Sequence, residues 1–367
     1  MKRLTGLALS LFFCSIVTAQ NKPRIDFETY NPPSSLIVPE NPIKKAKFPF
    51  IDVHNHQYNM PTQDIPALLK QMDSLNMKVM VNLSGRGSMN DNNHLVNAIQ
   101  NAKKSTPNRI VVFTNVSFNG VGGPEWTSKT VAQLEADVKA GAQGLKVYKS
   151  LGFSAKDING NILRVDDPRL DPVWAKCGEL GIPVLIHTAD PKQFWQEADE
   201  HNERWLEVIT YPNRKRSNTD PAPWQDMIQQ QHNIFRKHPK TTFINAHFGW
   251  YANDLAHLSK LADSFPNMYV EFGAVIAELG RQPKAAKAFF EKYQDRILFG
   301  KDSWVPSEYS TYFRVLETED EYFPYHKKYH AFWRMYGLGL SDRILKKVYY
   351  KNALKLIPRI DKTLFPD

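Results

Sequence analysis

Two histidines that could hold a metal ion from a single strand stand in the motif DVHNH, residues 52–56. The motif follows the apolar run FPFI and therefore ends the first expected strand. Because side chains alternate between the two faces of a strand, His54 and His56 point the same way, with Cα atoms about 7 Å apart. Two imidazoles placed in this way can converge on one ion. Asp52 lies on the same face, one layer deeper, where it could orient a ligand.

Three further polar residues directly follow apolar runs: His187 in VLIHTAD, His247 in FINAHFGW and Asp302 in LFGKDSW. Each alone has an ordinary explanation, because strand-end histidines are often surface or core residues and an aspartate can cap a helix. Matching positions at the ends of four strands are much harder to obtain by accident. We therefore expect a metal site made of His54, His56, His187 and Asp302.

The ligand types indicate which ion such a site would take. Nitrogen and carboxylate ligands without thiolate suit zinc best, and manganese, iron or cobalt also accept them. Three histidines and one carboxylate leave room for a water molecule, whose pKa the metal would lower to near neutrality.

The elements that must position these residues are visible as eight apolar runs separated by helix-like stretches. The runs are FPFIDV, KVMVNL, RIVVFTNV, AQGLKVY, IPVLIH, TTFINAH, NMYVEFG and RILFG. Between them lie amphipathic segments such as PALLKQMDSL, often followed by a Gly or Pro stop. This alternation predicts a parallel sheet covered by helices, either a closed (β/α)₈ barrel or an open doubly wound sheet. The count of eight favours the barrel, whose carboxyl-end mouth would gather the polar residues.

The rest of the chain adds a leader, an arm and an insertion to this plan. Residues 1–19 resemble a cleavable secretory signal, with a basic start and an apolar run shorter than the ~20 residues of a spanning helix. A secreted or periplasmic location follows, with a membrane anchor as the alternative. Residues 20–47, rich in Pro, Asn and Lys, predict an extended N-terminal arm, and residues 48–360 the barrel. A long insertion follows the fifth strand, at about residues 189–223, and carries several aromatic residues.

Composition narrows the classes of partner and of fold. With 367 residues, 42% of them hydrophobic, the chain can bury a large core. Removal of the leader leaves one cysteine, Cys177, which we interpret as a core residue, so no intramolecular disulfide is expected. The formal net charge of +9 comes from scattered Lys and Arg without a long basic run. We expect no nucleic-acid partner and no stable membrane insertion, and a homo-oligomer is compatible with the sequence.

These motifs, in this order, resemble the amidohydrolase superfamily, and within it the amidohydrolase-related family of lactonases, hydratases and decarboxylases such as aminocarboxymuconate-semialdehyde decarboxylase. The resemblance rests on DVHNH, DDPRLDPVWAKCGELGIPVLIHTAD, INAHFGW, FPNMYVEFG and RILFGKDS. It implies that Asp302 binds the metal or takes a proton from its water. It also implies that His247 polarises the substrate, acts as acid or base, or binds a second metal. The family usually shows a small residue before the last Asp, whereas Lys301 stands here.

Lys146, in the expected fourth strand AQGLKVYKS, decides between one metal ion and two. A lysine at the end of a buried strand is costly unless it is paired or modified. In binuclear members of the superfamily a lysine in a similar context is carboxylated and bridges two metals. Alternatively, Lys146 binds a substrate carboxylate or pairs with Glu271 on the seventh strand. We expect one ion, because the other motifs match the mononuclear branch.

The leading functional hypothesis is hydrolysis of an amide, lactone or ester by a metal-activated water. A lyase on the same site, either a decarboxylase or a hydratase, is the alternative, and a binding module without turnover is the remote one. Three cations beyond strand ends, Arg86, Lys149 and Lys301, predict a small anionic substrate if they are more than solvated rim charges. Trp195 and Trp205, in the insertion, would then cover a ring of the substrate, unless they only pack the insertion onto the barrel.

Overall fold

The computed structural model describes residues 26, 29–87, 93–327 and 333–366. The chain divides into two compact units, residues 1–35 and 36–367. In the first unit, the backbone N–H groups of Thr29 and Tyr30 donate to the carbonyl of Asp26 at 3.1 and 2.9 Å, and residues 29–35 are exposed. The second unit holds the barrel and every candidate site residue.

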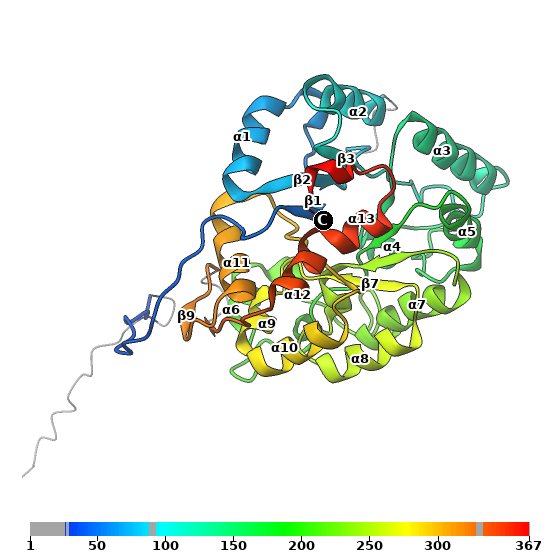
Figure 1. Ribbon diagram of the computed structural model, residues 1–367. Helices are drawn as coiled ribbons and strands as arrows, with labels where there is room; N and C mark the ends of the chain where they lie inside the picture. Colours follow the sequence, from blue (N-terminus) through cyan, green and yellow to red (C-terminus); the bar gives the residue numbers. More distant parts are fainter. Residues whose placement is uncertain (1–25, 27–28, 88–92, 328–332, 367) are drawn as a thin grey trace, which may run out of the picture. The chain divides into compact units, whose positions relative to one another are not determined.

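Eight parallel strands form the centre of the second unit (Figure 1). They are β1 (Phe50–Asn55), β2 (Met77–Asn82), β3 (Ile110–Val112), β4 (Leu145–Val147), β5 (Val184–Ile186), β6 (Phe243–Asn245), β7 (Met268–Glu271) and β8 (Ile297–Leu298). Each coincides with one of the eight apolar runs. Neighbouring strands pair from β1 to β3 and from β4 to β8.

Two parallel bridges join these sheets into a ring. Thr114 pairs with Leu145 between β3 and β4, and Asn55 pairs with Asp302 between β1 and the residues after β8. The backbone N–H of Asp302 donates to the carbonyl of His54 at 2.7 Å. The sheet is therefore closed, and the expected (β/α)₈ barrel is confirmed over the open doubly wound sheet.

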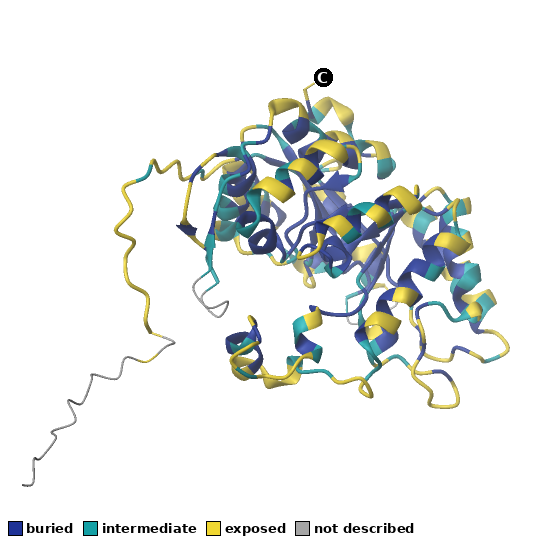
Figure 2. Cartoon of the chain, turned by 90° about the horizontal axis from the view of Figure 1, so that it is seen from below, coloured by how far each residue is buried: buried dark blue, intermediate teal, exposed yellow. Residues whose placement is uncertain are grey.

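Helices surround the strands, and Figure 2 shows that the helix residues facing the strands are buried while those on the outer faces are exposed. They are α1 (Ile65–Leu75), α2 (His94–Ser105), α3 (Trp126–Ala140), α4 (Ser150–Phe153), α5 (Asp171–Glu179), α6 (Trp205–Thr210), α7 (Trp224–Lys237), α8 (Leu255–Ser264), α9 (Ile276–Arg281), α10 (Pro283–Lys292), α11 (Tyr309–Glu317), α12 (Asp342–Lys346) and α13 (Asn352–Leu356). In α1, for example, the side chain of Asp64 accepts from the N–H of Ala67 and caps the start, while Asn76 ends the helix in a left-handed conformation.

The expected insertion after β5 consists of short helical turns. It contains 3-10 turns at Lys192–Trp195 and Pro212–Arg214 and the helix α6 before α7 begins. The buried guanidinium of Arg204 pairs with Glu207 of α6 and with Glu278 of α9, and it lies over the ring of Trp333. Strands β9 (Phe323–Pro324) and β10 (Arg334–Met335) form a separate antiparallel pair. The ion pair of Arg204 with Glu278 attaches the insertion to the segment that follows β7.

Only part of the expected N-terminal leader and arm lies within the described residues. Residues 1–19, the expected leader, lie outside the described residues. Residues 36–47 belong to the same unit as the barrel, where the side chain of Asn41 bonds to Asp320 at 2.7 Å and the N–H of Lys47 to Glu317 at 3.0 Å. No helix among the described residues combines the length and hydrophobicity needed to cross a membrane. Cys177 is fully buried, as expected of a core residue.

Candidate metal centre

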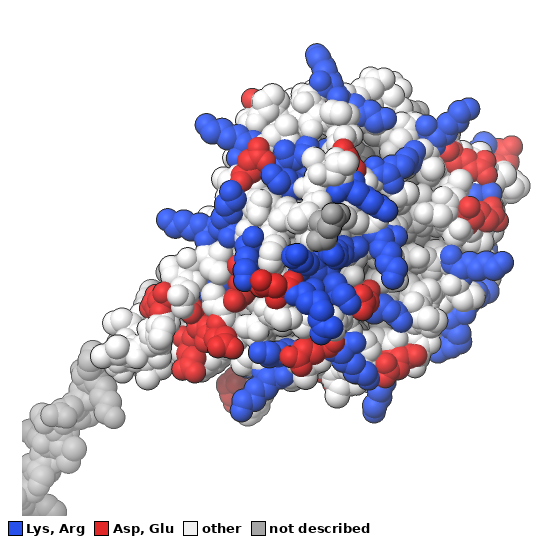
Figure 3. All heavy atoms as spheres, in the orientation of Figure 1, with Lys and Arg blue, Asp and Glu red and all other residues white. Residues whose placement is uncertain are grey.

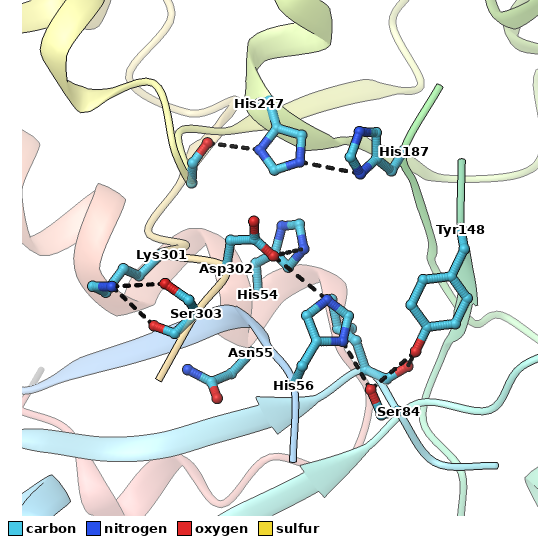
Figure 4. A network of polar contacts seen from close by, with 12 residues as sticks. His54, Asn55, His56, Ser84, Tyr148, His187, His247, Lys301, Asp302 and Ser303 are labelled. Carbon is cyan, nitrogen blue, oxygen red and sulfur yellow. Dashed lines mark hydrogen bonds and ion pairs between the residues drawn. The ribbon is translucent and has the colours of Figure 1, made fainter. Parts of the chain in front are cut away.

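One carboxylate of the barrel mouth lies between the two histidines of the DVHNH motif (Figure 4). The Oδ1 atom of Asp302 is 3.2 Å from Nε2 of His54 and 3.5 Å from Nε2 of His56. The potential ligand atoms of these three residues all lie within 4.8 Å of one another. The strand alternation expected from the sequence thus brings both imidazoles to the same side, where β8 supplies the carboxylate.

The other nitrogen of His54 is held by a buried carboxylate on β7. Nδ1 of His54 lies 2.8 Å from Oε1 of Glu271, and both side chains are fully buried. Oε1 also accepts from the N–H of His247 at 2.8 Å, and Oε2 accepts from the N–H of Gly273 at 2.6 Å. A second grouping of possible metal ligands contains Glu271 together with His54 and His247. Because both Glu271 oxygens already accept hydrogen bonds, we assign Glu271 as the group that orients His54 and leaves its Nε2 facing the site.

His187 and His247 face each other on the opposite side of the same site (Figure 4). Nε2 of His247 is 3.3 Å from Nδ1 of His187. Nδ1 of His247 lies 2.7 Å from the carbonyl of Gly273, and Nε2 of His187 lies 3.1 Å from the carbonyl of Ala189. A carbonyl can only accept, so in neutral rings these outer nitrogens carry the protons. The two facing nitrogens then both present lone pairs, an arrangement that favours a cation between the rings.

The strand ends that carry these groups contain unusual backbone conformations. His247 has φ 58° and Asp302 has φ 84°, both in the region that favours glycine. Ala189 after β5 and Ala274 after β7 also have positive φ, at 62° and 58°. Each such residue costs of the order of 1 kcal/mol, and such strain collects at functional sites. The backbone therefore bends sharply at four strand ends on the mouth of the barrel.

The charge states in the metal-free protein follow from burial and from neighbouring charges. Burial would lower the pKa of His54, but the negative charges of Glu271 and Asp302 together raise it to about 9. Burial lowers the pKa of His56 to about 3, and burial also holds the pKa of His187 well below its usual value. Burial opposes the charge of Asp302, yet the neighbouring His54 holds its pKa well below the usual range. Near pH 7 the metal-free site therefore contains neutral His56 and His187, an ionised Asp302 and a protonated His54, which would release a proton on binding a metal ion.

The residues present fit a divalent ion. Nε2 of His54 is buried and makes no hydrogen bond among the described residues, while Oδ1 of Asp302 lies 3.2 Å away. Such an orphaned nitrogen is costly unless a proton or a metal occupies it. Three histidines and one carboxylate match the nitrogen and oxygen donor sets of zinc and of its first-row neighbours.

A cavity of about 190 Å³ opens beside these groups. Its lining includes His187, His247 and Asp302 together with Trp250 and Lys149. The ring of Trp250 stacks on His247 with centroids 4.6 Å apart. Of the three cations expected to bind substrate, Lys149 is the one that lines this cavity, and its amine lies 2.6 Å from Oδ1 of Asp190.

The other two expected substrate cations are engaged within the fold. Arg86 donates from Nε and Nη2 to the buried Asp137 at 3.0 and 2.6 Å. Lys301 is 2% exposed, and its amine bonds to Ser303 and, at 2.6 Å, to Glu308. In Figure 4 the Lys301 amine points away from His54 and His56. Each of the two has a carboxylate partner that the sequence does not reveal, so neither is a solvated rim charge, and a substrate contact by Arg86 or Lys301 stays a prediction.

The two tryptophans of the insertion are also placed away from the cavity lining. Trp195 donates to the carbonyl of Ala222 at 2.8 Å and packs edge-on against Phe153. Trp205 begins α6. Phe194 and Trp250 provide the aromatic lining of the cavity instead. The packing alternative for Trp195 therefore agrees with its contacts, and a substrate contact by either tryptophan stays a prediction.

Lys146 on β4 is buried next to the centre, with its amine 5.6 Å from the ring centroid of Tyr148. It is 1% exposed, and among the described residues its Nζ makes no hydrogen bond. Burial lowers its pKa to about 8, although the charges of Asp302 and Glu271 oppose this shift. The pairing of Lys146 with Glu271 considered above is not formed, because Glu271 binds His54 instead.

Several residues at the site carry no recognisable signal in the sequence. Glu271, Ser84, Tyr148 and Trp250 all contact a candidate ligand histidine. Of these residues, Glu271 alone stands at the end of an apolar run, a position that suggested a pairing with Lys146 instead. Outside the site, His232 of α7 is also buried.

The fold and the site define a class of protein, namely a (β/α)₈ barrel with histidines and an aspartate converging at its mouth. The amidohydrolase family model matches residues 51–359, so the chain belongs to the amidohydrolase family. The resemblance noted from the motifs is confirmed, and with it the expectation of an enzyme of a metal-dependent family. No curated protein is significantly similar to the chain.

Solved structures support the fold. An uncharacterised TIM-barrel protein from Bordetella bronchiseptica is 16% identical, with a TM-score of 0.51, over 84% of this chain and 97% of that chain. A 4-oxalomesaconate hydratase from Rhodopseudomonas palustris is 14% identical, with a TM-score of 0.50, over 86% and 97% of the two chains. A dihydroxybenzoic acid decarboxylase from Polaromonas, with bound manganese and the inhibitor 2-nitroresorcinol, is 15% identical, with a TM-score of 0.51, over 84% and 96%. At these identities the likeness establishes the TIM-barrel fold alone.

Proposed function

We propose that the protein is a metal-dependent hydrolase that cleaves an amide, lactone or ester bond of a small organic anion. The observation that carries the proposal is the placement of the ionised Asp302 carboxylate within 3.5 Å of both motif histidines, on the cavity that also contains His187 and His247. We propose His54, His56, His187 and Asp302 as ligands of one divalent ion, with zinc the best match to the donor set. When bound, such an ion lowers the pKa of a water molecule and polarises a substrate oxygen.

The chain's own groups supply proton transfer. Asp302 is the carboxylate beside both motif histidines, and its oxygen that does not bind the ion would accept a proton from water. His247 is fixed by its Nδ1 contact to Gly273, and its Nε2 can accept a proton and return it to a leaving group. Trp250, stacked on His247, fixes the plane of the ring and limits access of water.

The charge of the cavity supports an anionic substrate. Lys149, Arg204, Arg214 and Lys327 line it, against the acidic Asp190, Glu207 and Asp302. Asp302 is assigned to the metal, which adds further positive charge. Lys and Arg are otherwise spread over several elements, interspersed with acidic side chains, on the face drawn in Figure 3. Because Lys149, Arg204 and Arg214 are themselves paired with carboxylates, the metal ion would supply much of the positive charge that a substrate carboxylate meets in this cavity.

The second candidate is a lyase on the same site. The hydratase and the manganese-containing decarboxylase share this fold, and both act without cleaving an amide or ester. The same positive cavity would accept an unsaturated or aromatic acid.

We further propose that residues 1–19 direct the protein out of the cytoplasm. Expression with the leader, followed by a mass measurement of the N-terminus, would test this proposal.

The test combines metal analysis with a parallel screen. Purified protein is assayed with lactones, N-acyl amino acids and hydroxybenzoates in ¹⁸O-labelled water. Hydrolysis places ¹⁸O in the product acid, whereas carbon dioxide release without ¹⁸O incorporation in the remaining product establishes the lyase. His54→Ala/His187→Ala serves as the control and should lose both metal and turnover. Full metal occupancy in this double variant would overturn the ligand assignment.

A further inference from the structure

His56 is supported by a chain of neutral hydrogen-bonding groups rather than by a carboxylate (Figure 4). Nδ1 of His56 lies 2.8 Å from Oγ of Ser84, which lies 2.9 Å from the hydroxyl of Tyr148. The Tyr148 hydroxyl in turn lies 3.2 Å from the carbonyl of Leu83. The ring of Tyr148 also stacks on the imidazole of His56, with centroids 5.6 Å apart.

The direction of these hydrogen bonds follows from the group at the end of the chain. The carbonyl of Leu83 can only accept, so the Tyr148 hydroxyl donates to it. The Tyr148 oxygen is then the acceptor for the Ser84 hydroxyl, and the Ser84 oxygen the acceptor for His56 Nδ1–H. Every donor in the series finds an acceptor, and the lone pair of His56 is left on Nε2, the nitrogen nearer Asp302.

We propose that Ser84 and Tyr148 are positioning residues for the metal centre. They hold His56 in the tautomer and ring orientation that direct Nε2 at the ion, a role that rests on the proposed function. Ser84 is itself fixed, because its backbone N–H donates to the buried side chain of Asn82 at 3.0 Å. The support therefore reaches from β2 and β4 to the ligand on β1.

The two histidines of one motif thus receive different kinds of support. His54 donates to an ionised carboxylate, which increases the electron density on its ligand nitrogen, whereas His56 donates to a hydroxyl. Tyr148 also lines a second cavity of about 360 Å³, over the ends of β3 and β4, whose lining includes Lys146 and Ser154. A ligand in that cavity would contact Tyr148, which is two hydrogen bonds away from His56.

The experiment measures zinc affinity by competition with a chromophoric chelator, which needs no substrate. We expect Ser84→Ala to weaken zinc binding about tenfold, the lower end of the range for lost supporting hydrogen bonds. Tyr148→Phe keeps the stacked ring and removes only the hydroxyl, so it should weaken binding by about threefold. Because Tyr148 acts through Ser84, the double variant should bind zinc as Ser84→Ala does, without a further loss. Ser154→Ala, on the wall of the same cavity, is the matched control and should bind as wild type.

A second readout separates positioning from general structural damage. Long-range ¹H–¹⁵N spectra of zinc-loaded protein with labelled histidine report which nitrogen of His56 carries the proton. We expect Nδ1–H in wild type, with its proton signal displaced in Ser84→Ala while the signals of His54 stay in place.

Three outcomes would contradict the proposed positioning of His56 by Ser84 and Tyr148. They are wild-type zinc affinity in Ser84→Ala, multiplied losses in the double variant, or a proton on Nε2 of His56. If Ser84→Ala fails to fold, Tyr148→Phe and the tautomer of wild type still test the proposal. A wild-type protein that binds no zinc would instead overturn the proposed function.

Discussion

Oε1 of Glu271 lies 2.8 Å from Nδ1 of His54 and also accepts the backbone N–H of His247. A single buried carboxylate thereby fixes a proposed ligand from β1 and the proposed proton acceptor after β6. Its own charge is stabilised by these donors: burial alone would raise its pKa, but the neighbouring His54 lowers it to about 2. Glu271 is therefore ionised whenever the protein is folded near neutral pH.

Glu271→Gln should weaken metal binding by about tenfold to a hundredfold, because a neutral amide cannot support His54 as an anion does. The amide nitrogen must also face a donor on one side, since both carboxylate oxygens accept hydrogen bonds in the structure. Zinc affinity by chelator competition is the measurement, with the exposed Glu291→Gln as control. Equal affinities in the two variants would show that Glu271 has no influence on the site.

Lys146→Met should leave one metal ion per chain and stabilise the metal-free protein by about 2 kcal/mol. The reason is that a buried amine without a hydrogen-bond partner among the described residues, whose pKa burial lowers to about 8, favours the unfolded state. Urea unfolding and native mass spectrometry, with and without bicarbonate, measure both quantities. Lys149→Met, which removes an amine paired with Asp190, is the control and should not stabilise. Loss of metal together with loss of about one bound carbon dioxide would instead establish a carboxylated, bridging Lys146.

Arg86→Ala should destabilise the fold rather than change substrate binding. Its guanidinium is bonded in bidentate fashion to the buried Asp137, and removal of one partner of such a pair costs about 3 kcal/mol. Urea unfolding measures the loss, and metal content should be unchanged. A variant with wild-type stability but a raised KM for an anionic substrate would restore the earlier interpretation of Arg86 as a substrate ligand.

His232 should make the folded state sensitive to acid. Burial, with the nearby charges of His257 and Arg236, lowers its pKa from 6.5 to about 4. Between these values the unfolded chain binds a proton that the folded chain does not, so stability falls as the pH falls from 6.5 to 4. At about 1.4 kcal/mol per pKa unit, the full loss is on the order of 3 kcal/mol.

The variant His232→Phe isolates this contribution. It replaces a ring that packs among Phe235, Tyr251 and Phe265 by another aromatic ring. The free energy of unfolding is measured for both proteins from pH 7 to 4. Wild type should lose more stability than the variant as the pH falls. A pH-independent difference would show that His232 does not titrate in this range.

The sequence by itself determined the barrel and the residues that end its strands. Each strand is a short apolar run between amphipathic helices. Such a local pattern can be recognised without knowing which residues it contacts in the fold. Strand alternation placed His54 and His56 on one face, and strand ends placed His187, His247 and Asp302 at the same mouth. These inferences depend on local periodicity and on the closure of parallel strands.

Only the tertiary structure decided which side chain meets which. Arg86 pairs with Asp137, 51 residues along the chain, and Lys301 turns to Glu308 instead of to the rim. Glu271 bonds to His54, 217 residues away, and the amine of Lys146 has no hydrogen-bond partner among the described residues. Such pairings depend on rotamers and on the stagger between strands, which hydrophobic periodicity does not encode. The strand positions could therefore be predicted, whereas the partners that fix charge and orientation required the closed barrel.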